Sequence, residues 1–285
     1  MNLLAGIRVV STALNLPGPA ACARLRELGA ALAKVEPPSG DPFEQYRPAW
    51  YARLHRDVRV LRLDLKSPEG REAMDALLHD ADLLVTAQRR AALARMGLDA
   101  GQLAERFPRL CHVAIAGHAP PDEDVAGHDL TYLATQGLVQ PPAMPLTLFA
   151  DMAGAERAVS AALAMLLARE RDGRGRSITT ALADAARTLA APLHEGLTSP
   201  GAILGGGYAG YNLYAASEGW IAVAALEPHF ARRLAEALEI PELSIDLLKD
   251  RFATRTARDW QLWARERDLP IVAVRTPPTG RKPIE

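Results

Sequence analysis

The sequence predicts an α/β fold in which a parallel sheet with helices on both faces is followed by a smaller α+β domain. Short apolar or β-branched runs alternate with helical patterns from residue 7 to residue 117, which is typical of a parallel sheet covered on both faces. The residue composition changes near residue 200, where a Gly-rich stretch precedes two short predicted strands and a predicted helix. The chain has 285 residues, of which 49% are hydrophobic, enough for one large and one small domain. We therefore expect a large Rossmann-like domain followed by a small one.

The strands and helices of the large domain follow from local patterns. Ser67 before Pro68 predicts the start of a helix over 67–81, because serine suits the N-cap and proline the first turn. Parallel sheets bind ligands beyond the carboxyl ends of their strands, so the loop 14–19 is expected in a ligand crevice. The predicted strands are 7–11, 32–36, 59–65, 82–87 and 110–117, and another helix is predicted over 17–30.

A long apolar segment follows the large domain's first strands. A short strand over 145–150 is expected to run into Asp151, and a long helix follows whose apolar residues predict deep burial. Residues 177–191 predict one more strand and a buried helix. This segment would complete the large domain.

The second half predicts a separate small domain. Residues 199–212 are Gly-rich and indicate a linker or loop, and a hairpin is expected around Glu218 and Gly219. A helix is expected from Pro228. The predicted boundaries are 1–198 for the large domain, 199–270 for the small domain, and 271–285 for a C-terminal tail.

Charge and cysteine content limit the partners and the compartment. The formal net charge is -1, so no overall field favours nucleic acid or an anionic membrane. Cys22 and Cys111 cannot build a disulfide framework, and they fit a reducing compartment. The N-terminus lacks a charged region before its apolar run, and no stretch reaches bilayer length. We expect a cytoplasmic protein with neither nucleic acid nor membrane as partner.

Several common cofactor motifs are missing from the sequence. It contains no G-x-G-x-x-G, no phosphate-binding G-x-x-x-x-G-K-[ST] and no G-x-S-x-G. It also has no metal-ligand spacing of cysteine or histidine. The sequence therefore predicts neither a dinucleotide cofactor nor a metal.

Four polar residues near predicted helix starts are candidates for chemistry. Asp129 could be an ordinary N-cap with His128 as a polar loop residue, and Asp151 could be an N-cap, a role worth ~1 kcal/mol. Glu227 could simply interact with a helix dipole. Taken singly, none of these residues identifies a function.

Five blocks of the sequence together resemble a known family. In chain order they are 17–42, 63–85, 89–98, 107–117 and 150–186, and they resemble the class III CoA-transferase family. The resemblance implies an acyl-CoA substrate with no cofactor other than the coenzyme A thioester itself. It also implies a homodimer, in which the two chains of relatives interlock.

Three segments are similar to the α-methylacyl-CoA racemase branch of that family. They are 126–138, which contains His128, then 205–214, and 224–230, which contains Glu227. The resemblance implies that His128, supported by Glu227, is one acid/base and that Asp151 is the other. An imidazole with an ordinary pKa of ~6.5 suits proton transfer near neutral pH. The first function expected is therefore racemisation or epimerisation of a 2-methylacyl-CoA or related thioester by two-base transfer of the α-proton through an enolate.

The resemblance also implies a set of coenzyme A contacts. Arginine forks suit phosphate oxygens, and Arg89 lies where relatives bind coenzyme A. The full set implied for coenzyme A binding is Arg56, Arg59, Arg89, Asp129 and Tyr211.

Two other functions stay open. In a CoA-transferase, Asp151 would attack the acyl-CoA as a nucleophile and form a mixed anhydride, with no required role for His128. In a non-catalytic acyl-CoA-binding member, the site would have decayed. Three departures from the family pattern keep that reading open: Thr147 stands for a usual asparagine, 88–90 departs from its motif, and the chain ends near the start of the return segment of relatives. The sequence does not name the acyl group.

Overall fold

The computed structural model describes residues 2–277, and these form two compact units. The first unit reaches Leu189 and the second begins at Ala190, whereas the sequence patterns placed this boundary after residue 198. Of the expected tail 271–285, residues 278–285 lie outside the described part.

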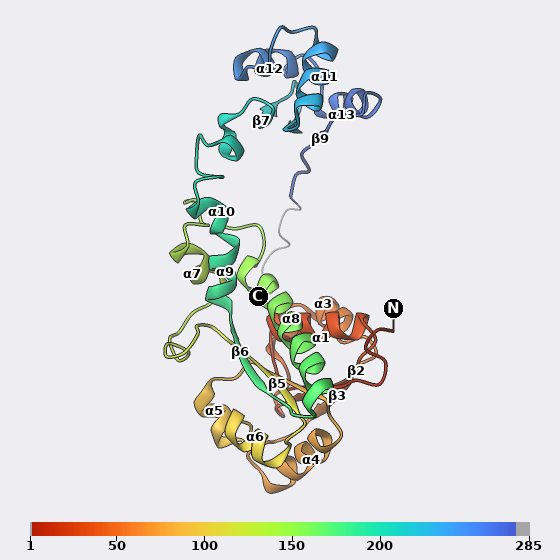
Figure 1. Ribbon diagram of the computed structural model, residues 1–285, viewed down its shortest axis with the longest axis vertical. Coiled ribbons are helices and arrows are strands. Elements are labelled where there is room, and N and C mark those ends of the chain that lie inside the picture. Colours follow the sequence, from red (N-terminus) through yellow and green to blue (C-terminus); the bar gives the residue numbers. More distant parts are fainter. Residues whose placement is uncertain (1, 278–285) are drawn as a thin grey trace. The chain divides into compact units, whose positions relative to one another are not determined.

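The first unit is built on a six-stranded parallel sheet, which confirms the predicted fold class (Figure 1). Its order is β3-β2-β1-β4-β5-β6, the order of a Rossmann sheet. The order reverses between β1 and β4, so their carboxyl ends flank the usual ligand crevice. The strands are β1 (Arg8–Ser11), β2 (Ala31–Glu36), β3 (Arg59–Arg62), β4 (Leu83–Thr86), β5 (Cys111–Ala116) and β6 (Ser177–Ala181).

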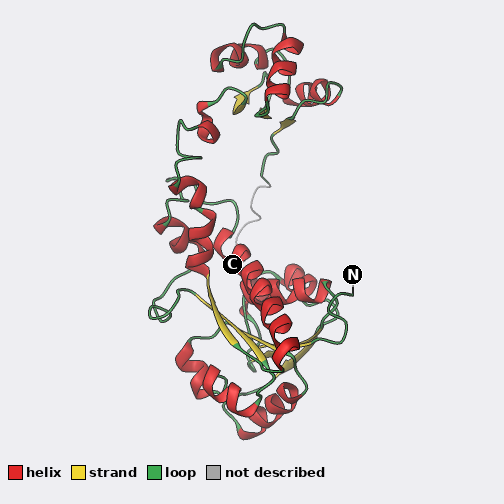
Figure 2. Ribbon diagram, viewed as in Figure 1, coloured by secondary structure: helices red, strands yellow, loops and turns green. Residues whose placement is uncertain are grey.

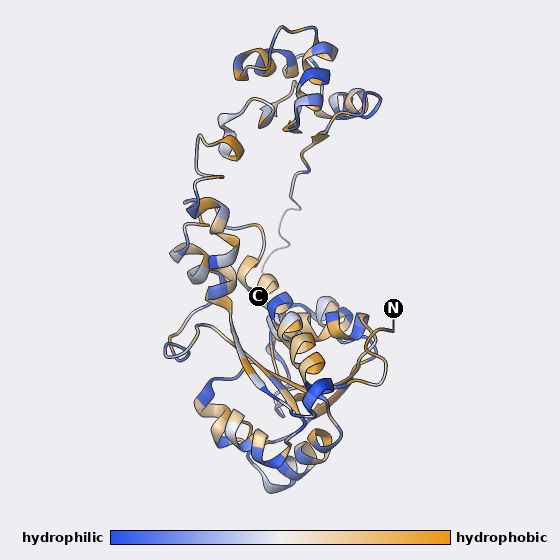
Figure 3. Ribbon diagram, viewed as in Figure 1, coloured by the Kyte–Doolittle hydropathy of each residue, from blue (hydrophilic) through white to orange (hydrophobic). Residues whose placement is uncertain are grey.

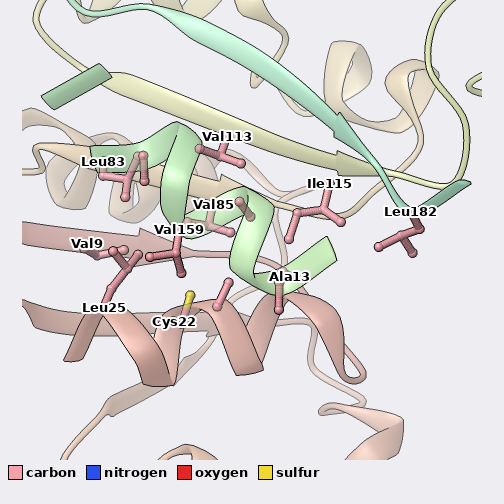
Figure 4. Close-up of a cluster of buried hydrophobic side chains, with 14 of the residues drawn as sticks. Val9, Ala13, Cys22, Leu25, Leu83, Val85, Val113, Ile115, Val159 and Leu182 are labelled. Carbon is pink, nitrogen blue, oxygen red and sulfur yellow. The ribbon is translucent and has the colours of Figure 1, made fainter. Parts of the chain in front are cut away.

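Helices cover both faces of this sheet (Figure 2). On one face α1 (Pro17–Glu27) and α8 (Phe149–Asp172) enclose a core with β1, β4 and β5, and Figure 4 shows Cys22, Val85 and Val159 within it. The opposite face packs against α4 (Pro68–His79), α5 (Arg90–Arg95) and α6 (Ala100–Arg106). The remaining helices of this unit are α2 (Pro42–Tyr46), α3 (Pro48–Leu54), α7 (Asp129–Thr135) and α9 (Leu182–Leu189).

Local signals set most element boundaries. The Ser67 hydroxyl accepts a hydrogen bond from the backbone N–H of Gly70 at 3.0 Å, so the predicted N-cap of α4 is confirmed. The helix predicted over 17–30 appears as α1 and ends at Glu27. Strand β3 is shorter than predicted and ends at Arg62.

The predictions for the segment around α8 were wrong in two respects. No strand forms over 145–150, because helix α8 already begins at Phe149. The helix is also not buried all round: Met152, Leu163 and Leu167 are exposed, although Figure 3 shows mainly apolar colours along it. Its buried stripe includes Gly154, where an added Cβ would lie 2.3 Å from Leu182 Cδ2. Glycine therefore lets α8 lie close against the start of α9.

A buried ion cluster ties the loops after β1 and β2 together. Lys34 Nζ lies 3.1 Å from Glu36 Oε1 and 2.5 Å from Asp41 Oδ2, and all three side chains are almost fully excluded from solvent. The other oxygen of Asp41 accepts from the backbone N–H of Asn15 at 3.1 Å and of Phe43 at 2.9 Å. One buried carboxylate therefore holds two separate loops at the carboxyl edge of the sheet.

The second unit contains a three-stranded antiparallel sheet in the order β7-β8-β9. The predicted hairpin around Glu218 and Gly219 joins β7 to β8, and β9 falls in the segment expected to be tail. The strands are β7 (Tyr211–Ala215), β8 (Trp220–Ala224) and β9 (Ile271–Ala273), and the helices are α10 (Ala191–His194), α11 (Pro228–Leu238), α12 (Ile245–Phe252) and α13 (Ala257–Arg265).

The Gly-rich stretch is a folded turn rather than an open linker. Residues Ile203–Gly207 form the single turn η1, and the Asn212 side chain donates to the Gly206 carbonyl at 2.9 Å. An added Cβ at Gly205 would lie 1.9 Å from the Ser199 carbonyl oxygen. The chain is packed on itself here, which only glycine permits.

Over residues 2–277, no helix combines the length and the apolar character that crossing a membrane requires.

Replacing Lys34 with methionine should destabilise the first unit strongly. The change leaves the buried carboxylates of Glu36 and Asp41 without their cation, and breaking such a cluster typically costs about 3–5 kcal/mol. Urea unfolding monitored by circular dichroism would measure the loss. Lys66→Met is the matched control, since Lys66 is exposed and its loss should change stability by less than about 0.5 kcal/mol. Equal stability of the two variants would contradict the account.

Candidate active site

Two loops at the carboxyl edge of the sheet are joined by one hydrogen bond between side chains and one from a side chain to the backbone. The loop after β1, predicted to line a crevice, begins at Thr12, whose hydroxyl donates to Gln88 Oε1 at 2.9 Å. Gln88 follows β4 and donates back to the Thr12 carbonyl at 2.6 Å. These two bonds join the loops on either side of the point where the strand order reverses.

Two carboxylates meet where helices α7 and α8 begin. Asp129 Oδ1 accepts the backbone N–H of Asp151 at 3.0 Å, and the same carboxylate also accepts the N–H of Ala150. The N-cap expectations were wrong for both acids. His128 is the N-cap of α7, so Asp129 is its first helical residue, while Leu148 is the N-cap of α8 and Asp151 stands in its first turn.

The arrangement alters the acidity of Asp151. Burial, and then the negative charge of Asp129, raise its pKa from 3.8 to about 6. Burial also raises the pKa of Asp129, although its two backbone donors oppose the shift. Asp151 is therefore partly protonated near pH 6, where an exposed aspartate is almost fully ionised.

Asn15 and Tyr46 are site residues that the sequence patterns did not reveal. The Tyr46 hydroxyl donates to Asn15 Oδ1 at 2.9 Å, and its pKa is raised by burial, then by the charges of Asp41 and Asp151. Tyr46 therefore belongs to the surroundings of Asp151. Asn15 has φ of 63°, a left-handed conformation that asparagine tolerates better than most residues. The sequence signal that could have identified Asn15 was an asparagine in the loop after a predicted strand.

The start of α7 is held in place by a buried tyrosine. Tyr132 is 3% exposed, and an added Cβ at either Gly117 or Gly127 would lie 2.4 Å from its side chain. These two glycines let the chain before α7 and the end of β5 close around the ring. Burial, and then the charges of Asp151 and Asp129, raise the pKa of Tyr132.

His128 is exposed beside this packed start. Its backbone N–H donates to Thr131 Oγ1 at 3.0 Å, and Thr131 Oγ1 donates to the His128 carbonyl at 2.8 Å. These bonds fix the backbone while the imidazole faces solvent. The structure thus brings the His128 segment and Asp151 to neighbouring helix starts through Asp129.

Glu227 and Tyr211 belong to the second unit. Glu227 is the exposed N-cap residue of α11, consistent with a carboxylate near a helix start. Tyr211 opens β7 and lines a cavity of about 480 Å³ with residues of η1 and β8. Each residue is placed within its own unit, so pairing of Glu227 with His128 stays a prediction.

The three arginines lie at different parts of the sheet. Arg89 is the N-cap of α5 beyond the carboxyl end of β4, whereas Arg59 begins β3 and thus lies toward the opposite edge of the parallel sheet. The Arg56 carbonyl accepts from Arg26. The structure therefore does not group Arg59 with Arg89.

One cavity of the first unit is lined by Arg89, and Asp151 is not among its lining residues. It measures about 540 Å³ and is lined by Arg89, His112 and Glu123, among others. Arg90 Nη1 lies 3.1 Å from Glu123 Oε1 at its wall, and burial lowers the pKa of His112 to about 4. The imidazole of His112 is therefore neutral. Within residues 2–277 no cluster of His, Cys, Asp or Glu could hold a metal ion.

Comparison with known proteins places this architecture in a family. The model of CoA-transferase family III matches residues 4–279. The human alpha-methylacyl-CoA racemase is 30% identical over 90% of this chain and 74% of its own length. The succinate–glutarate CoA-transferase of Agrobacterium fabrum is also 30% identical, over 90% of this chain and 70% of its own length.

Solved structures agree on the fold. A CAIB/BAIF family protein from Brucella suis superposes with a TM-score of 0.81 at 24% identity, covering 96% of this chain and 84% of that chain. The family model extends over nearly the whole sequence and the structural match over both units. The chain belongs to CoA-transferase family III.

Proposed function

We propose that the protein racemises or epimerises an acyl-CoA that carries a hydrogen and a branch at the α-carbon. The observation that carries the proposal is the meeting of the His128 segment and Asp151 at two adjoining helix starts, with the pKa of Asp151 near 6. A carboxylate and an imidazole from two different segments suit inversion of a carbon acid, which needs one base and one acid. The match to a racemase supports the same choice.

The chemistry requires one proton to leave and another to arrive on the opposite face. One of the pair, ionised Asp151 or neutral His128, takes the α-proton, and the C–H electron pair moves onto the thioester oxygen as an enolate. The second group, then protonated, delivers its proton to the other face and restores the C–H bond. Glu227 would hold the His128 imidazole in the required tautomer, as a carboxylate does in a triad.

Two of the N–H groups at the start of α8 are not available to this enolate. The N–H groups of Ala150 and Asp151 are already bonded to Asp129. The oxyanion must therefore be stabilised by other donors.

CoA transfer is the second candidate function. Asp151 is only half-buried and lies in its first helical turn, where a carboxylate can reach a thioester carbonyl. Attack would form an acyl–aspartyl anhydride and release coenzyme A as a thiolate. The thiolate would then attack the aspartyl carbonyl, which releases the first acid and leaves coenzyme A bound to Asp151 as a thioester. A second carboxylate would displace coenzyme A to form a new anhydride, and attack of the thiolate on its acyl carbonyl would give the new acyl-CoA and free Asp151. The match to a succinate–glutarate CoA-transferase supports this candidate.

The two functions separate in D₂O with a single enantiomer of a 2-methylacyl-CoA. We expect deuterium to enter the α-carbon at the same rate as chirality is lost. Mass spectrometry would measure the deuterium, and chiral chromatography would measure the loss of chirality. Asp151→Asn and His128→Ala should each slow both by ~10²–10⁴-fold, the usual contribution of an acid/base. Glu156→Gln, on the exposed face of the same helix, and His79→Ala are matched controls that should leave the rates unchanged.

Three other results would change the assignment. Coenzyme A transfer to an added carboxylate without α-exchange would establish the transferase. Neither reaction, with binding of acyl-CoA retained, would indicate the non-catalytic member. Full activity of His128→Ala would contradict two-base racemisation.

Glu227 gives an independent test of the racemase. Glu227→Gln should lower the rate of α-proton exchange at least about tenfold, because the imidazole loses the carboxylate that would orient it. Coenzyme A transfer by Asp151 alone would be unaffected. Glu236→Gln, a second exposed glutamate on α11, is the control. Equal exchange rates for the two variants would remove Glu227 from the mechanism.

We further propose that the protein is a homodimer. The exposed apolar side chains of Met152, Leu163 and Leu167 on α8 support this, since such side chains are usually covered when they gather on one helix. Light scattering should give twice the chain mass of 30.7 kDa. Substituting Leu163 and Leu167 by lysine should shift the mass toward the monomer. A monomeric mass for the unmodified chain would contradict the proposal.

A further inference from the structure

Asp129 has a position that neither helix capping of α7 nor coenzyme A binding explains. It is 5% exposed, and its carboxylate turns away from its own helix to accept N–H groups of α8. Those groups have no partner within their helix, because the first N–H groups of any α-helix lack one. An acid on one helix therefore caps another helix, across 22 residues of sequence.

We propose that Asp129 is a positioning residue that clamps the start of α8 to the start of α7 and keeps a second negative charge beside Asp151. The clamp joins the segments that carry the two proposed acid/base groups. His128 directly precedes Asp129, and one of the N–H groups bound by Asp129 is the backbone N–H of Asp151. The inference deepens the proposed function and rests on it only for the catalytic consequence.

The clamp places a fixed anion, the Asp129 carboxylate, at the positive end of a long helix. Helix α8 has 24 residues, and its N-terminal N–H groups favour negative charge. Asp129 neutralises that end, so Asp151 gains little from the helix and instead faces a like charge. Neighbouring carboxylates disfavour each other's ionisation, and the charge of Asp129 accordingly contributes to the raised pKa of Asp151.

The ionisable groups acting around Asp151 come from two neighbouring elements. Asp129 and Tyr132 belong to α7, and Tyr46 to α2. Of these, only Asp129 is anionic near pH 7, and after burial it is the main cause of the raised pKa of Asp151. The other ionisable residues on elements packed against α8 are Cys22, Arg24, Arg26 and Glu27 on α1, Cys111 and His112 on β5, and Asp184 and Arg187 on α9.

The sign of the expected pH effect follows from this charge. Asp151 acts as a base only when ionised, so exchange of the α-proton that it removes should rise with pH through about 6. Removing the charge of Asp129 favours ionisation of Asp151. The rise should therefore move to lower pH, while staying above 3.8 because burial remains.

The substitution Asp129→Asn separates charge from hydrogen bonding. Asparagine keeps an oxygen that can accept the N–H groups of α8, but it carries no charge. Carbon-13 NMR of aspartate-labelled protein, with the Asp151 signal assigned from Asp151→Asn, would report the carboxyl pKa directly. We expect a lower value in Asp129→Asn and no change in Asp172→Asn, which removes an exposed charge from the far end of α8.

Kinetics and unfolding give two further readouts. Asp129→Asn should shift the acid limb of the pH profile in the same direction and leave the KM for acyl-CoA within about twofold, because the side chain is committed to α8. Asp129→Ala removes the acceptor as well, so its urea midpoint should fall below that of Asp129→Asn.

The outcomes are distinguishable from failure of the proposed function. An unchanged Asp151 pKa in Asp129→Asn, or a raised KM with that pKa unchanged, would overturn the inference, the latter in favour of coenzyme A binding by Asp129. Equal urea midpoints for the alanine and asparagine variants would overturn the clamp. A lowered pKa in a protein that catalyses no α-exchange would leave the inference standing and refute the racemase.

Discussion

The carboxyl edge of the first unit depends on one buried lysine. Lys34 sits at the middle of β2 and is held between Glu36 and Asp41. Burying three charges is costly unless each finds partners, and here the partners are the loops themselves. Asp41 accepts a hydrogen bond from the Asn15 backbone N–H, and Asn15 Oδ1 accepts one from the Tyr46 hydroxyl. The position of Tyr46 near Asp151 is thus set through an ion cluster that is almost fully excluded from solvent.

The site combines rigid and open parts. Tyr132 and its two flanking glycines close the start of α7 by packing, and Asp129 joins it to α8 by hydrogen bonds. His128, by contrast, remains exposed. Fixed backbones with an accessible side chain suit the proposed reaction, in which a base and an acid must reach one carbon from two sides.

The sequence predicted the fold well because alternating strands and helices carry strong local signals. Ser67 and Pro68 marked a helix start through their own chemistry. The start of α8 was predicted wrongly, since the apolar run at 145–150 fits a strand or a helix equally. The partnership of Asp129 with Asp151 could not be predicted, because it joins two helices through a bond across 22 residues. The same holds for Tyr46, whose place near Asp151 follows from folding.

The raised pKa of Asp151 also has a thermodynamic meaning for the whole chain. The folded state holds this carboxyl with a pKa of about 6, against 3.8 for the ordinary group, so between these values it binds more protons than the unfolded chain. By linkage, the contribution of this group to the unfolding free energy falls as pH rises through that interval, and stays low above it. The chain therefore gives up folding stability at neutral pH by burying this carboxyl beside Asp129, and the remainder of the first unit has to offset that loss.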